Sequence, residues 1–184
     1  MRYQALLYDA PEAQLDLSLF LFDGTPRLSG WSAPPVYSDR LRLVEPDIWS
    51  LVGAAVLVMF EATIELLEPH ITTAGELLPL HVQGKDDPAF ALNVLADINC
   101  LDQGATDFGD PSMRRLSFVE HRLPEDGLFK VPEYDTVDIY LLERGRQSGS
   151  FRSVIEQRGL TGISLVPVWS TTDGTIPYDL ARDV

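Results

Sequence analysis

The sequence predicts an α+β fold built mainly of antiparallel sheet in short strands, with two principal helices at about residues 56–68 and 150–158. Short apolar stretches alternate with turns rich in Pro, Gly and Asp along most of the chain, a pattern typical of antiparallel strands. Only two segments place their apolar residues with the spacing of a helix. No shift in composition marks a boundary, so residues 1–184 are expected to form a single domain.

The first 44 residues are expected to hold a hairpin and a loop. Residues 3–8 are short and apolar, and residues 15–22 place a leucine at every second position. That is the period of a strand with one buried face. Residues 24–40 contain three prolines and two glycines, so they are expected to be a connecting loop.

The two helices are predicted from their apolar faces and their ends. In residues 56–68 the large apolar side chains share one side of the helix and three glutamates form a narrow stripe. Pro69 is expected to end this helix. The second helix begins after Ser150, a residue that caps helix N-termini, and ends at Gly159, which suits a left-handed stop. The glutamate stripe consists of Glu61, Glu65 and Glu68.

The remaining strands are expected in the middle and last third of the chain. Two of them flank a polar turn at residues 83–88. The tail, residues 171–184, is expected to be irregular. The predicted strands are residues 77–80, 90–95, 116–120, 128–131, 137–142 and 163–168.

The charge excludes several classes of partner. The chain has 28 acidic and 14 basic residues, a net charge of −14. Such a surface repels phosphate and attracts basic proteins, so nucleic acids and anionic membranes are not expected as partners. The longest apolar run, residues 51–60, is too short to span a bilayer, and the N-terminus has no signal-peptide core. A cytoplasmic protein is therefore expected.

The inventory of catalytic and metal-binding motifs is thin. The chain has no nucleophile elbow, phosphate-binding loop or zinc-protease motif. A single cysteine, Cys100, excludes a disulfide framework and zinc sites built on paired cysteines. Its three histidines lie in separate neighbourhoods. We therefore expect no metal and no cofactor, and a non-enzymatic binding protein.

Three stretches of the chain resemble a known family. They are Pro46–Trp49 with the helix that follows; Glu76–Leu80 with residues 92–95 and Cys100–Asp102; and residues 128–140 followed by Phe151, Gly159–Ile163 and Trp169. In this order they resemble bacterial immunity proteins of polymorphic toxin systems, once described only as a domain of unknown function. The resemblance covers about residues 45–169. It implies a role beside toxins of type VI secretion and of the Rhs type.

The leading hypothesis is therefore an immunity protein that blocks the active site of one cognate toxin. The acidic charge favours a basic toxin that acts on nucleic acid, either a nuclease or an RNA-modifying ADP-ribosyltransferase. Within the family-like region, Asn93 is expected to satisfy backbone groups and Gly162 to permit a close or unusual backbone conformation. The candidate toxin contacts are two aromatic anchors, Trp31 and Tyr37, and four acidic residues, Asp86, Asp87, Glu125 and Asp126.

Two alternatives stay open. The chain could be a small hydrolase that uses Glu125 and Asp126 with His121, which would require a concave pocket around them. It could instead be an adaptor domain of a secretion apparatus, which would copurify with secretion components rather than with one toxin.

Overall fold

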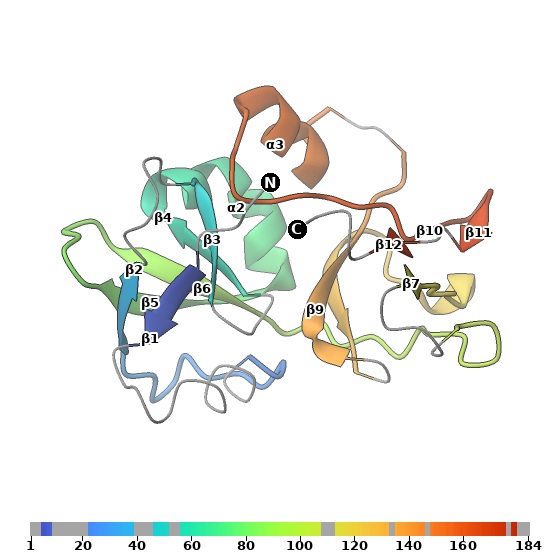
Figure 1. Ribbon diagram of the computed structural model, residues 1–184, viewed down its shortest axis with the longest axis horizontal. Helices are drawn as coiled ribbons and strands as arrows, with labels where there is room; N and C mark the ends of the chain where they lie inside the picture. Colours follow the sequence, from blue (N-terminus) through green and yellow to red (C-terminus); the bar gives the residue numbers. More distant parts are fainter. Residues whose placement is uncertain are drawn as a thin grey trace.

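The computed structural model describes residues 5–8, 22–38, 46–51, 56–107, 113–132, 135–145, 148–175 and 178–179. Within these residues two helices accompany a curled, mostly antiparallel sheet and a separate hairpin (Figure 1). The predicted α+β class is confirmed. The helices are α2 (Glu61–Ala74) and α3 (Phe151–Arg158), and a short 3-10 turn covers Glu120–Arg122. The longer strands are β1 (Ala5–Tyr8), β2 (Pro35–Ser38), β3 (Ile48–Leu51), β4 (Leu57–Phe60), β5 (Gly75–Val82), β6 (Ala89–Val94), β8 (Gly127–Val131) and β9 (Asp135–Leu142).

The curled sheet has the strand order β2-β5-β6-β4-β3. Strand β1 pairs antiparallel with β2 and parallel with β3, so it joins the two edges and closes the sheet into a small barrel. Strand β2 runs parallel to β5, and the other neighbours are antiparallel. Closure leaves no edge strand in this sheet, because each of its strands has a partner on both sides.

Side chains that point alternately to the two faces of the strands form two cores, one on each face of the sheet. Trp49 and Val58 point into the barrel, while their neighbours Ile48 and Met59 belong to the core outside it. Because successive side chains of a strand point to opposite faces, one short strand serves both cores. The interior core consists of Phe22, Val36, Trp49, Leu51, Val56, Val58, Leu78, Leu80, Val82, Ala89 and Ala91.

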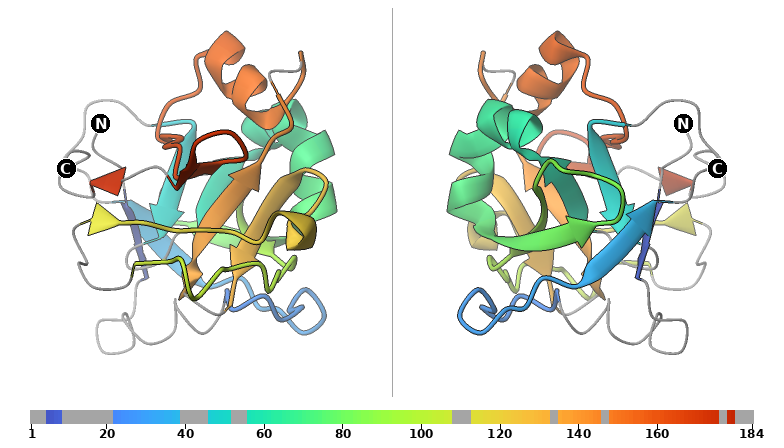
Figure 2. Two further views of the ribbon diagram at one scale, coloured as in Figure 1. Left: turned by 90° about the vertical axis from the view of Figure 1, so that its right-hand side faces the viewer. Right: turned by 90° about the vertical axis from the view of Figure 1, so that its left-hand side faces the viewer.

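Helix α2 fills the space between the barrel and the β8–β9 hairpin. Its buried residues Leu67, Ile71 and Ala74 share one core with Leu92 of β6 and Leu128 of β8. Helix α3 lies against α2 and adds Phe151 and Ile155 to the same core (Figure 2). A third core lies around the hairpin and contains the buried Cys100.

Four two-residue strands lie at the end of the molecule opposite the barrel (Figure 1). Strand β10 (Trp169–Ser170) pairs with β11 (Gly174–Thr175), and β12 (Tyr178–Asp179) pairs with β7 (Met113–Arg114). Within the tail expected to be irregular, residues 171–184, the described residues therefore include two two-residue strands, β11 and β12.

The first predicted helix is displaced along the sequence. Residues 57–60 form β4, and the helix begins at Glu61 and runs through Pro69 to Ala74. Strand β4 lies between β3 and β6 and is packed on both faces, so its sequence is a continuous apolar run that periodicity does not distinguish from a helix. Burial of Leu67, Ile71 and Ala74 outweighs the cost of a proline inside the helix.

Three further strand predictions are corrected. Residues 35–38 form β2, although they were expected to be loop. Residues 116–120 contain only an isolated bridge at Phe118. Residues 163–168 form no strand, although Ile163 and Leu165 pack against the core around α2. In the last two segments, apolar alternation reflects burial of one side of the chain rather than strand pairing. The predicted strand at residues 15–22 lies outside the described residues except for Phe22, which is in a turn.

The second helix is confirmed, and so are the predicted strands on either side of the turn at residues 83–88 and those at residues 128–131 and 137–142. Strands β5 and β6 flank the predicted turn, and β8 pairs with β9 across the predicted positions. The Ser150 hydroxyl accepts a hydrogen bond from the N–H of Ser153, and Gly159 ends α3 in the left-handed conformation. These elements have local signals, a turn or a cap, that do not depend on distant contacts.

Candidate binding surface

The loop from Phe22 to Pro34, which leads into β2, is attached to the barrel at both ends. Phe22 is buried in the interior core, and its ring meets that of Trp31 edge-on at 6.2 Å. The indole N–H of Trp31 donates to the carbonyl oxygen of Pro79 in β5 at 2.8 Å. The loop is therefore bound to the barrel by two aromatic side chains rather than by sheet pairing.

The carboxylate of Glu76, at the start of β5, holds the middle of this loop. It accepts hydrogen bonds from the backbone N–H groups of Arg27 and Leu28, the second at 3.0 Å. It also accepts one from the Asn93 side chain at 2.9 Å. Partial burial by itself raises the pKa of Glu76, but the hydrogen bonds from Asn93, Arg27 and Leu28 outweigh it and lower that pKa below its usual value.

Asn93 of β6 ties the loop to the neighbouring strand. Its side chain is fully buried, and its amide nitrogen also donates to the carbonyl oxygen of Thr25 at 2.9 Å. This confirms that Asn93 satisfies a backbone group. The nitrogen must face this side, because a flipped amide would place its oxygen against the Glu76 carboxylate.

A second group of charges lies at the start of the loop. Asp23 and Arg27 form an ion pair in which one guanidinium nitrogen of Arg27, Nη2, lies 3.1 Å from each carboxylate oxygen of Asp23. Lys130 of β8 is only 2% exposed, and its ammonium group donates to the carbonyl oxygen of Phe22. Burial raises the pKa of Asp97, the nearby Lys130 opposes that rise, and Asp23 adds to it. Side chains of β5, β6 and β8 therefore all fasten this one loop.

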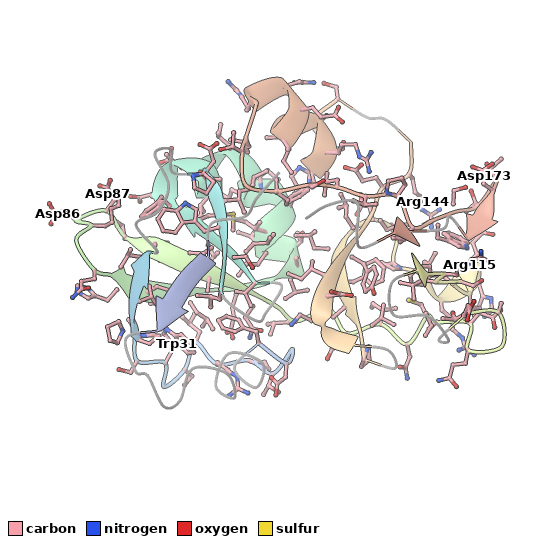
Figure 3. The ribbon with its side chains drawn as sticks, in the orientation of Figure 1. Trp31, Asp86, Asp87, Arg115, Arg144 and Asp173 are labelled. Atoms are coloured by element: carbon pink, nitrogen blue, oxygen red, sulfur yellow. The ribbon has the colours of Figure 1, made fainter. Side chains whose placement is uncertain are left out.

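The loop continues into β2, which pairs with the end of β5 that precedes the β5–β6 turn. The N–H of His81 donates to the carbonyl of Pro34 at 3.1 Å, and that of Gln83 to Val36 at 2.8 Å. Asp86 and Asp87 follow in the turn, and both are exposed. Figure 3 shows them in the same half of the molecule as Trp31. We call residues 26–31 and 83–87 together the loop–turn surface.

The predicted contact residues are only partly brought together. Trp31, Asp86 and Asp87 belong to the loop–turn surface, although Trp31 is half-buried and largely packs against the barrel. Glu125 and Asp126 are exposed in the turn before β8. The carbonyl of Glu125 accepts a hydrogen bond from Arg144 at 2.8 Å, and Arg144 lies in the opposite half of the molecule (Figure 3). Tyr37 is in β2, paired with Leu7, and its side chain lies outside the described residues.

One residue of this surface, Leu28, and two residues that hold its loop, Glu76 and Lys130, were missed. Leu28 is 56% exposed at the tip of the loop. Its only signal in the sequence is an apolar residue inside a segment of turn formers. Glu76 and Lys130 carry no signal, because their bonds to the loop join residues 48 and 108 positions apart.

Among the described residues, neither a metal site nor a buried group of catalytic carboxylates is found. No group of three His, Cys, Asp or Glu side chains among them could hold a metal ion. His121, Glu125 and Asp126 are all exposed, so none has the burial that commonly tunes a catalytic acid. The hydrolase alternative stays a prediction without support from this arrangement. Within the part of the chain described, no helix has the length and apolar character needed to cross a membrane.

Comparison with known proteins gives no match: neither a protein-family model nor a curated protein matches this chain. The resemblance to immunity proteins, read from residues 45–169, stays a prediction.

Proposed function

We propose that this chain is a cytoplasmic immunity protein that binds and neutralises one cognate antibacterial toxin. The observation that carries the proposal is the anchored loop: three strands contribute side chains that hold it, and it exposes an apolar side chain to solvent. A preorganised loop of this kind lowers the entropic cost of binding a protein. The resemblance over residues 45–169 supplies the class of partner.

The net charge of −14 supports a basic partner. A negative field raises the rate at which a positively charged domain is captured and disfavours nucleic acid as the ligand. A toxin that acts on nucleic acid needs a basic cleft, so a nuclease or an RNA-modifying ADP-ribosyltransferase fits best. The inhibitor would act by covering that cleft, without chemistry of its own.

The test is growth rescue. The toxin domain encoded beside this gene is expressed in bacteria alone, with the wild-type chain, or with an unrelated acidic protein of similar size as the control. We expect growth only with the wild-type chain, and a stable complex on size-exclusion chromatography. Toxicity that persists with the wild-type chain, with no complex formed, contradicts the proposal. Copurification with secretion components instead would favour the adaptor alternative.

A further inference from the structure

We propose that the partner covers the loop–turn surface and that Leu28 is the apolar side chain that it buries. This inference rests on the proposed function, because it names the face that a toxin domain would cover. Among the described residues, only Leu28 and Val166 are large apolar side chains in the exposed class, at 56% and 36%. A lone exposed leucine is ordinary, so the argument depends on how Leu28 is held.

The backbone of Leu28 is bonded on both sides. Its N–H donates to Glu76 at 3.0 Å, and its carbonyl accepts the N–H of Trp31 at 3.3 Å. Asp23 and Arg27 brace the preceding turn by their ion pair. The loop therefore holds the Leu28 side chain toward solvent with little backbone freedom left to lose. A side chain held in this way loses little conformational entropy when a partner buries it, so more of the free energy of its burial appears as affinity.

The charges at the two ends of the loop–turn surface specify the partner. Four carboxylates (Asp23, Glu76, Asp86 and Asp87) and two cations (Arg27 and Lys85) lie in or directly under the loop–turn surface. Asp86 and Asp87 are exposed and leave the turn with a net negative charge. The partner that fits is a basic domain with an apolar pocket for Leu28 and Lys or Arg residues facing the turn.

The dimensions allow one partner to reach both parts. Leu28 is bonded at Glu76, and β5 rises about 3.3 Å per residue from there to Val82, so the turn that carries Asp86 and Asp87 lies about 20 Å from Leu28 along the strand. A standard interface of about 800 Å² on each side is roughly 30 Å across. A second copy of this chain fits poorly, because each copy carries −14.

The first experiment compares Leu28→Ser with Val166→Ser, the matched control at the other exposed apolar residue. The toxin domain encoded beside the gene is the probe, and its Kd is measured by calorimetry. We expect Leu28→Ser to raise the Kd at least about 30-fold and Val166→Ser less than about threefold. Circular dichroism and thermal unfolding check that both variants fold.

The second experiment separates the two acidic turns. Asp86→Asn with Asp87→Asn, and Glu125→Gln with Asp126→Asn, each remove two exposed carboxylates. We expect the first double variant to slow association about three- to tenfold at low salt and the second to change it less than twofold. Equal slowing by both would mean that only the total charge matters, and would contradict a contact at the loop–turn surface.

The outcomes distinguish this inference from the proposed function. If the wild type binds and Leu28→Ser binds equally well, the loop–turn surface is wrong while the immunity function stands. If the wild type neither binds nor rescues, the proposed function fails and this inference fails with it. If sedimentation shows a wild-type dimer that Leu28→Ser dissociates, a second copy covers this surface and the proposal of a toxin contact is overturned.

Discussion

At the scale of single residues, the Glu76 carboxylate joins the loop to the barrel. Three donors converge on it, two from the loop backbone and one from Asn93. Two N–H groups of one loop would otherwise depend on water. The Glu76 side chain therefore keeps much of the loop in the proposed binding surface in one conformation.

We predict that Glu76→Gln removes a pH-dependent part of the stability. The folded pKa of Glu76 lies below its ordinary value of 4.5, so its contribution is complete above that value and is lost as the pH falls through the folded pKa. Near neutral pH the variant should be about 1–2 kcal/mol less stable. The difference should shrink toward pH 3, measured by urea unfolding across this range. A difference that is constant with pH would contradict the role of the ionised carboxylate.

Gly162 is a second residue with a decisive local role. Its φ is +89°, and a Cβ added there would lie 1.9 Å from the carbonyl oxygen of Ile48. The expected close and unusual backbone is therefore confirmed. Gly30 has a similar φ of +90° with nothing within 4 Å of the added Cβ, which makes it a matched control.

We predict that Gly162→Ala is clearly more destabilising than Gly30→Ala. Both variants force alanine into a left-handed conformation, which costs about 1–2 kcal/mol. Only Gly162→Ala also pushes a methyl group into the backbone of β3, so its total cost should be about 3 kcal/mol or more. Urea unfolding of the two variants measures the difference, and equal losses would show that β3 is not packed against this glycine.

At the scale of elements, β4 and α2 follow one another without a loop, and the conformation changes from strand to helix at Glu61. Strand β4 is fixed by ladders to β3 and β6, and α2 by burial of its apolar face. Pro69 lies inside α2 and is exposed. It lacks the N–H that would bond to the carbonyl of Glu65, and its ring crowds that carbonyl.

We predict that Pro69→Ala stabilises the protein by about 1–2 kcal/mol. Alanine restores the missing backbone donor and removes the crowding, although the more flexible unfolded chain offsets part of the gain. Thermal unfolding with far-ultraviolet circular dichroism is the measurement. A loss of stability would show that the packing of α2 between the barrel and β8 needs the bend that proline imposes.

At the scale of the whole molecule, the charge of −14 acts over distances longer than any contact. The loop–turn surface carries part of that charge, and the rest is spread over both halves of the chain. All of this charge contributes to long-range steering, and the carboxylates nearest the contact contribute most, whereas the fit of the bound complex depends on the contacts.

We predict that capture of the toxin domain slows about tenfold or more between about 20 and 500 mM NaCl, while dissociation changes little. Salt screens the field that attracts a basic partner, and the buried contact at Leu28 is not sensitive to it. Stopped-flow mixing or surface binding measures both rates. An association rate that does not change with salt would show that the net charge does not speed capture of the toxin domain.

Much of the fold could be predicted because its signals are local. Ser150 and Gly159 define the ends of α3, and the turn at residues 83–88 defines the β5–β6 hairpin. The predictions fail at residues 57–60 and 163–168, where partners distant in the chain decide whether an apolar segment is strand, helix or neither. Of the candidate site, Trp31, Asp86 and Asp87 could be named in advance. Leu28 could not, because exposure follows from what surrounds a residue.

The sequence by itself determined the α+β class, the second helix, the strands of the β5–β6 and β8–β9 hairpins and the excess of negative charge, since each depends on composition or on neighbours a few residues apart. Only the tertiary structure decided that the sheet closes into a barrel, that α2 runs through its proline, and that Glu76, Asn93 and Lys130 meet one loop. Those contacts join residues from about 50 to more than 100 positions apart. Their energies depend on geometry that no local pattern in the chain encodes.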